Sequence, residues 1–301
     1  MKKVLVTGGA GFIGSHLCEG LLARGYRVRA LDSLVYGRRE YVPAAVEFIQ
    51  GDIRDTAACQ RAVAGMDGVF HCAAMSRSGP SQAQIDICTQ SNITGTQNML
   101  LAARDGGVRA FIYSGSSTYY GNRAVPHRES DPPDLLNIYG LTKRVGEQYC
   151  QMFDKDFDVP CVVLRYFNVY GPRQPETGAY ALVLGIFLSR HANKQVLEIH
   201  GGGEQRRDFV HVRDVVAANI SAFERAGEKG VRGEVFNVGS GENISVKELA
   251  DMISPHQIVT EGRKGDSAAT LADISKIKAV LGWSPQVSFA DGLKELKSLI
   301  K

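Results

Sequence analysis

Tyr139 and Lys143 are the residues whose types and spacing most directly indicate chemistry. They fit Tyr-x-x-x-Lys at the start of a helix predicted over residues 139–153. A separation of four residues puts the phenol and the ammonium on one helical face. A free phenol titrates near pKa ~10, and a close positive charge favours its ionised form. The pair could therefore supply a general base near neutral pH, although the pattern by itself also occurs by chance.

A hydroxyl-rich stretch, Ser114 to Gly121, precedes this helix and follows a predicted strand. Open α/β sheets bind ligands at the carboxyl ends of their strands, so these hydroxyls would lie where a ligand binds. The serines could instead belong to a turn in which their side chains bond the local backbone. The pattern alone leaves both interpretations open.

A glycine-rich turn near the N-terminus could hold a dinucleotide beside these groups. The apolar run at residues 4–6 does not alternate, which predicts a strand buried on both faces. The glycines that follow allow a tight turn and a close approach of the backbone to a pyrophosphate. The next helix, over residues 12–24, would direct its first amides at the phosphates. The predicted phosphate-binding residues are Gly8, Gly11, Phe12, Ile13 and Gly14.

Asp32 ends the second predicted strand, close to the usual distance of about 20 residues from such a turn. A carboxylate there can accept hydrogen bonds from the adenosine ribose hydroxyls and would repel a 2′-phosphate. NAD is therefore the predicted cofactor, while Arg38 and Arg39 keep NADP open as an alternative.

Two later strand ends supply further candidates for the cofactor site. Asp52 and Ile53 follow the third strand, where Asp52 could reach the adenine amino group. Asp52 could equally be a turn residue or a helix N-cap. Ala73 and Ala74 end the fourth strand, and their small side chains would leave room for the diphosphate and ribose.

Composition narrows the class of protein. The 301 residues are 44% hydrophobic and 22% charged, as in an ordinary globular chain. A formal net charge of +3 is too small to indicate a nucleic-acid or anionic-membrane partner, and no apolar run approaches the roughly 20 residues of a membrane span. Six scattered cysteines without C-x-x-C predict no disulfide and no metal site. Together with a first strand that leaves no room for a signal peptide, these features predict a cytoplasmic protein.

Strand and helix alternate through the first half, which is typical of an α/β fold with a doubly wound parallel sheet, the Rossmann fold. Residues 1–165 are predicted to form this NAD-binding domain. Residues 166–301 are predicted to form mainly a smaller, mixed α/β substrate lobe, with some segments returning to the first domain. Within the lobe, Ser245 and Glu248 fit a capping box at the start of a helix.

Several motifs in order give the chain a resemblance to a known family. It resembles the extended short-chain dehydrogenases/reductases of the nucleotide-sugar epimerase/dehydratase group, and most of all their UDP-sugar 4-epimerases. The match runs nearly end to end and is more specific than any single motif. The segments that carry it are Thr7 to Gly14, His71 to Ala74, Tyr139 with Lys143, Arg165 to Arg173, Gly201 to Val212, Arg263 to Asp266 and Leu281 to Pro285.

The resemblance implies inversion at sugar C4 by oxidation and re-reduction with tightly bound NAD. Tyr139 would be the base, Lys143 would bind the nicotinamide ribose, and Ser116 would hold the sugar oxygen. On the substrate side, the resemblance assigns four residues to the nucleotide: Asn168, Arg207 and Arg263 at the diphosphate and Asp266 near the uridine ribose. It also implies a homodimer.

Four positions depart from related patterns. Ser117 and Thr118 stand where 4,6-dehydratases carry an Asp-Glu pair, and Thr118 also stands where UDP-uronic acid decarboxylases carry a glutamate. Thr270 replaces a bulky aromatic of hexose-restricted epimerases, which would widen the pocket for N-acetyl or carboxylate-bearing sugars. Tyr119 stands where epimerases commonly have an aliphatic residue, with no evident reason. A UDP-uronic acid epimerase or decarboxylase, a 4,6-dehydratase and a non-catalytic NAD-binding regulator remain alternatives.

Overall fold

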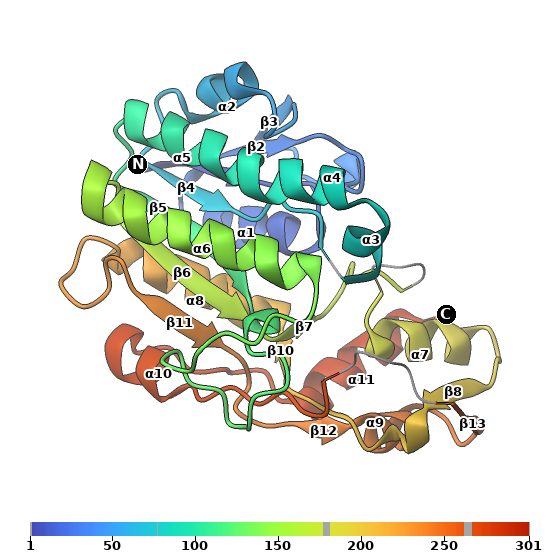
Figure 1. The fold of residues 1–301 in the computed structure, drawn as a ribbon. Helices are drawn as coiled ribbons and strands as arrows, with labels where there is room; N and C mark the ends of the chain where they lie inside the picture. Colours follow the sequence, from blue (N-terminus) through green and yellow to red (C-terminus); the bar gives the residue numbers. More distant parts are fainter. Residues whose placement is uncertain (1, 77, 177–180, 262–266, 301) are drawn as a thin grey trace.

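A seven-stranded parallel sheet forms the centre of the molecule (Figure 1). The structure is a computed structural model that describes residues 2–76, 78–176, 181–261 and 267–300. In spatial order the strands are β11 (Val235–Val238), β6 (Cys161–Tyr166), β5 (Ala110–Ser116), β4 (Gly68–His71), β1 (Lys3–Thr7), β2 (Arg27–Asp32) and β3 (Glu47–Gln50).

The strand order reverses direction at β1, which pairs with β2 on one side and β4 on the other. Because all the strands are parallel, Thr7, Asp32, His71, Ser116 and Tyr166 end at the same edge of the sheet. Such a reversal opens a crevice outside the carboxyl ends of the strands, which is where open α/β sheets bind ligands. The doubly wound fold is thus as predicted.

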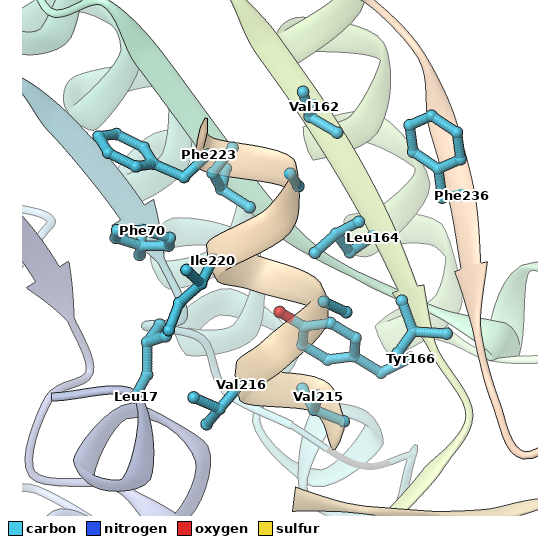
Figure 2. Close-up of a cluster of buried hydrophobic side chains, with 14 of the residues drawn as sticks. Leu17, Phe70, Val162, Leu164, Tyr166, Val215, Val216, Ile220, Phe223 and Phe236 are labelled. Carbon is cyan, nitrogen blue, oxygen red and sulfur yellow. The ribbon is translucent and has the colours of Figure 1, made fainter. Parts of the chain in front are cut away.

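Helices cover both faces of this sheet. One face carries α2 (Thr56–Val63), α5 (Gly95–Asp105) and α6 (Ile138–Phe157), whose buried side chains join those of Leu5, Phe111 and Val163. The other face carries α1 (Phe12–Ala23), α8 (Val212–Arg225) and α10 (Ser275–Leu281). Figure 2 shows side chains of α8, among them Phe223, packed beside Phe70 and Leu164 of the sheet.

The second half of the chain contributes to both parts of the molecule. Strand β11 and helices α8 and α10 belong to the central sheet and its cover. The described residues of a smaller lobe with its own apolar core form three two-stranded sheets and three helices. Its elements are β7 (Asn168–Tyr170), α7 (Val183–Ala192), β8 (Leu197–His200), β9 (Arg206–Arg207), β10 (Phe209–His211), β12 (Ile244–Ser245), α9 (Val246–Ile253), β13 (Gln257–Thr260) and α11 (Phe289–Leu299). The division at residue 165 itself stays a prediction.

Two local expectations have clear outcomes. The capping box is confirmed, since the Ser245 hydroxyl accepts from the Glu248 amide while the Glu248 carboxylate accepts from the Ser245 amide. The strand–helix alternation expected for the first half is less regular between β4 and β5, where α4 (Ile85–Thr89) and a short π-helix (η2, Gln90–Thr94) precede α5. In the described part of the chain, no helix has both the length and the apolar character of a membrane span.

Candidate active site

A cavity of about 1110 Å³ lies at the carboxyl edge of the central sheet. Its lining contains residues at the carboxyl ends of strands β1 to β6 and from the first turns of α1 and α6. Most of the predicted site residues share this one cavity: Gly8, Gly11, Phe12, Ile13, Gly14, Asp32, Asp52, Ile53, Ala73, Ala74, Ser116, Tyr139, Lys143 and Asn168.

The glycine turn forms one wall of the cavity and is packed too closely for side chains. Gly8 has a φ of +69°, and a Cβ there would lie 2.9 Å from the Ala73 nitrogen. A Cβ at Gly14 would lie 2.1 Å from the carbonyl oxygen of Gly8. Gly11 occupies the N-cap position of α1 and has no side chain to cap the helix. The first amides of α1 can therefore serve a bound phosphate, as a dinucleotide requires.

Asp32 and Asp52 lie in this cavity with different surroundings. The Asp32 carboxylate accepts from the amides of Ala10 at 3.0 Å and Leu34 at 2.8 Å, which holds it against the glycine turn. Two bonds leave lone pairs of the carboxylate for ribose hydroxyls. Asp52 instead forms an ion pair with Arg54, whose hydrogen bonds lower the pKa of Asp52. The helix N-cap considered for Asp52 is Asp55, which accepts from the Ala57 amide.

Ser116 and Tyr139 are brought together by a short loop and a helix start. Ser116 ends β5 and caps the 3-10 turn η3 (Ser117–Tyr119), where its hydroxyl accepts from the Thr118 amide at 3.3 Å and the Thr118 hydroxyl at 2.9 Å. Tyr139 lies in the first turn of α6, which Asn137 caps by accepting from the Gly140 amide at 2.8 Å. The turn interpretation and the ligand interpretation of the serines are thus compatible.

Lys143 lies one turn further along α6 and is buried. Its ammonium nitrogen is 4.3 Å from the centroid of the Tyr113 ring. Burial lowers the pKa of Lys143 to about 8, a change that nearby cysteines partly oppose. His71 is buried nearby, where burial and the charge of Lys143 lower the pKa of its imidazole to about 3. His71 is therefore neutral and does not repel the ammonium.

Asn168 joins the cavity to the lobe. Its amide nitrogen donates to the Asp208 carbonyl oxygen at 2.8 Å and to the Thr270 hydroxyl at 3.2 Å. The Thr270 hydroxyl also accepts from the Asp208 amide at 3.1 Å. Thr270 thus holds Asn168 in place, a role that its small size did not indicate.

Of the other predicted nucleotide-binding residues, the structure describes Arg207, which is not among the residues that line this cavity. Arg207 lines a smaller cavity of about 270 Å³ together with residues 285–289, and its guanidinium donates to the Arg206 carbonyl oxygen at 3.0 Å. Because β9 pairs with β12, the Arg207 side chain starts from the lobe and not from the central sheet. Arg263 and Asp266 lie outside the described residues.

Some cavity residues were not identified from the sequence. Cys72, Ser114 and Tyr166 line the cavity and form a partly buried polar chain. In it, the Ser114 hydroxyl is 3.2 Å from the Cys72 sulfur and 3.1 Å from the Tyr166 oxygen. Arg173 also lines the cavity and makes a bidentate ion pair with Glu19 of α1. Arg173 ends a motif of the resemblance, which was the available signal. Among the described residues, no cluster of three or more His, Cys, Asp or Glu side chains could hold a metal ion.

A glycine turn, an acidic strand end and a tyrosine–lysine helix around one crevice define a dinucleotide-dependent enzyme of the short-chain dehydrogenase/reductase class. The model of the NAD dependent epimerase/dehydratase family matches residues 4–239. The chain belongs to this family, and NAD is its cofactor.

Known proteins match the chain along almost its whole length. A UDP-glucose 4-epimerase of Mycolicibacterium smegmatis is 36% identical over 310 residues, covering 97% of this chain and 96% of its own. The crystal structure of a UDP-glucose 4-epimerase of Thermotoga maritima with UDP-glucose has a TM-score of 0.92 and 36% identity, covering 98% and 97% of the two chains. A UDP-N-acetylglucosamine 4-epimerase of Methanobrevibacter ruminantium, in complex with UDP-N-acetylmuramic acid, has a TM-score of 0.92 and 31% identity, covering 99% and 97%. The chain is thus an enzyme of the nucleotide-sugar epimerase/dehydratase family.

Proposed function

We propose that the protein is a UDP-sugar 4-epimerase that works through a 4-keto intermediate. UDP-glucose and UDP-galactose are the first candidate substrates, and N-acetylated forms are the next. The observation that carries this proposal is that Ser116, Tyr139 and Lys143 line the same cavity as the glycine turn and Asp32.

In this proposal Tyr139 is the catalytic base. As a phenolate it takes the proton of the C4 hydroxyl, and it returns a proton when C4 is reduced again. Lys143 supplies a positive charge on the same helix face, which favours the phenolate. Ser116 holds the sugar oxygen, and its bond from the Thr118 hydroxyl orients it. These groups position the substrate and move its proton.

NAD would be held by the amides of Gly11 to Gly14, by the Asp32 carboxylate at the adenosine ribose and by Lys143 at the nicotinamide ribose. When bound, NAD supplies a hydride acceptor that can return the hydride to the same carbon. The small residues Ala73 and Ala74 leave room for it, and Asp52 and Ile53 border its adenine end. The protein residues keep this site closed to a 2′-phosphate, since Asp32 would repel it.

On the nucleotide side, Asn168, Arg207, Arg263 and Asp266 are proposed to hold UDP. Guanidinium groups suit this role because their planar donors bind phosphate oxygens bidentately and stay charged. With the diphosphate held, the keto-sugar can turn within the cavity and present its other face to the cofactor. Inversion at C4 requires this turn.

Thr118 argues against the other reactions of the family. It is a neutral hydroxyl that donates to Ser116 at 2.9 Å. Dehydration requires an acid and a base at this place, and a serine–threonine pair cannot readily supply them. Decarboxylation of a UDP-uronic acid starts with the same C4 oxidation, but the glutamate of those enzymes is replaced here by Thr118.

The direct test is incubation with UDP-hexoses, UDP-N-acetylhexosamines and UDP-uronic acids, followed by separation of the products by configuration. The proposal predicts C4 epimers, with loss of turnover in Tyr139→Phe and unchanged binding of NAD and UDP-sugar. Full turnover by Tyr139→Phe would refute the assignment of the base. Products lacking a carboxylate or a water would identify a decarboxylase or a dehydratase.

A non-catalytic NAD-binding regulator predicts a different result. Such a protein would purify with NAD, yet no UDP-sugar would produce even a transient absorbance at 340 nm. The presence of Ser116, Tyr139 and Lys143 in one cavity favours the enzyme, since NAD binding alone does not need that trio.

A homodimer in the cytoplasm is part of the proposal. Two exposed apolar side chains on one face of α6, Leu141 and Met152, support a second copy packing against this helix. Light scattering coupled to size-exclusion chromatography would measure the mass of the assembly, and a monomer would exclude the dimer.

A further inference from the structure

A buried ion pair joins α6 to the central sheet beside the candidate catalytic residues. Nε and Nη2 of Arg165, on β6, donate to the two carboxylate oxygens of Glu147 at 3.0 and 2.7 Å. The exposed fractions of the two side chains are only 2% and 3%. Glu147 follows Lys143 by four residues, so both lie on the helix face that packs on the sheet. The ion pair therefore anchors the helix that carries Tyr139 and Lys143.

Tyr119 links this ion pair to the loop that begins at Ser116. It is the last residue of η3, and its buried ring lies 3.5 Å from Cζ of Arg165, measured to the ring centroid. Cζ of Arg144, which also pairs with Glu147, lies 5.2 Å from the same centroid. A guanidinium near an aromatic ring is attracted by the ring quadrupole, and most strongly where water is excluded.

The same loop also touches the first turn of α6. A Cβ at Gly140 would lie 3.2 Å from the Thr118 carbonyl oxygen, so the two backbones approach closely. Thr118 in turn donates to the Ser116 hydroxyl, and Gly140 directly follows Tyr139. The loop and the helix are thus held together at two places: Thr118 lies against Gly140, and Tyr119 is linked to Glu147 of α6 through Arg165 of β6.

We propose that Tyr119, Arg165 and Glu147 form a positioning brace that sets the separation between the Ser116 hydroxyl and the Tyr139 phenol. The inference rests on the proposed function and gives Tyr119 a role. None of the three brace residues is among the described residues that line the main cavity, although their neighbours Thr118 and Tyr166 are. The brace therefore acts on the alignment of the reacting groups and not on ligand binding.

Two substitutions of Tyr119 separate the effect of its aromatic ring from the effects of its other groups. Tyr119→Leu removes the aromatic face, whereas the matched control Tyr119→Phe keeps it. Because a small misplacement of reacting groups is costly, we expect Tyr119→Leu to lower kcat about tenfold, with KM and bound NAD within about twofold of wild type. Tyr119→Phe should match wild type. Rates are normalised to folded protein, measured by circular dichroism.

Three kinetic results would overturn the brace: an unchanged kcat in Tyr119→Leu, equal losses in the leucine and phenylalanine variants, or a loss confined to KM. If Tyr119→Leu does not fold, Tyr119→Met carries the same comparison, since methionine also lacks the aromatic face.

Amide hydrogen exchange gives a second readout that needs no turnover. Tyr119→Leu should speed exchange in η3 and in the first turn of α6, and Tyr119→Phe should not. Unchanged exchange in the leucine variant would refute the link between loop and helix. If the wild-type protein turns over no UDP-sugar, the proposed function fails, while the exchange comparison still decides whether the brace exists.

Discussion

Burial decides the charge of Lys143 near neutral pH. An ammonium in this cavity loses its hydration, which is why its pKa falls to about 8 from the ordinary value near 10.5. The neutral state of His71 keeps a second positive charge away from it. Lys143 is therefore charged below about pH 8 and neutral above it, and in the proposed mechanism its support of the Tyr139 phenolate would follow the same dependence.

A pH profile tests this account of Lys143. We expect kcat/KM to fall as pH rises through about 8, because the ammonium is present below that value and lost above it. Lys143→Met should remove this alkaline limb and lower activity by about 10²-fold or more at all pH values. Lys155→Met, on the exposed side of α6, is the control and should keep the wild-type profile. An alkaline limb that persists in Lys143→Met would assign it to another group.

At the scale of elements, the turn between β1 and α1 is the most demanding part of the site. Gly8 needs its left-handed backbone, and Gly14 lies against the Gly8 carbonyl. In both cases the nearest atoms belong to the backbone, which cannot move aside as a flexible side chain could. The turn therefore couples the start of α1 to the position of any bound phosphate.

Gly14→Ala should disrupt this coupling. The new Cβ would meet backbone atoms at 2.1 Å, so α1 must shift, at a cost of about 1–3 kcal/mol in the free energy of unfolding. We expect the variant to purify without NAD and to melt at a lower temperature. Gly227→Ala is the control, because a Cβ there meets open space. Normal NAD content in Gly14→Ala would contradict the close packing of the turn.

Local patterns in the sequence predicted the elements that depend on neighbouring residues. The glycine turn and the Ser245 capping box could be predicted from the spacing of neighbouring residues. The strand ends that form the cavity could be placed because parallel strands meet at one edge. The π-helix at Gln90–Thr94 was not predicted, and neither were the hydrogen bonds by which its Asn92 side chain holds the backbone of Met75, 17 residues away. The pairing of Arg165 with Glu147 also depends on a contact between a strand and a helix.

At the scale of the whole molecule, the second half of the chain completes the core of the first. Helix α8 covers one face of the sheet, with Phe223 packed 5.1 Å from Phe70 between ring centroids (Figure 2). A Cβ at Gly68 would lie 2.2 Å from the Phe223 ring, so β4 and α8 touch directly. The sequence predicted that some segments return to the first domain. Which residues of α8 pack on the sheet is seen only in the structure.

Phe223→Ala tests this shared core. Removing a buried ring should lower the free energy of unfolding by about 3–5 kcal/mol. Since α8 and the cofactor-binding sheet form one core, urea denaturation should remain a single transition, and NAD release should coincide with it. Val259→Ala, at a position 64% exposed, should change stability by less than about 0.5 kcal/mol. Separate transitions for the two halves would contradict a shared core.

The fate of the hydrogen at C4 tests the central claim most directly. A UDP-sugar that the protein turns over is prepared with deuterium at C4, and its epimer is analysed by mass spectrometry and NMR. The account predicts an inverted C4 that retains its deuterium, because the hydride would leave and return within the cavity formed around Tyr139, Lys143 and the glycine turn. Inversion with loss of the deuterium to solvent, or retention of configuration, would contradict it.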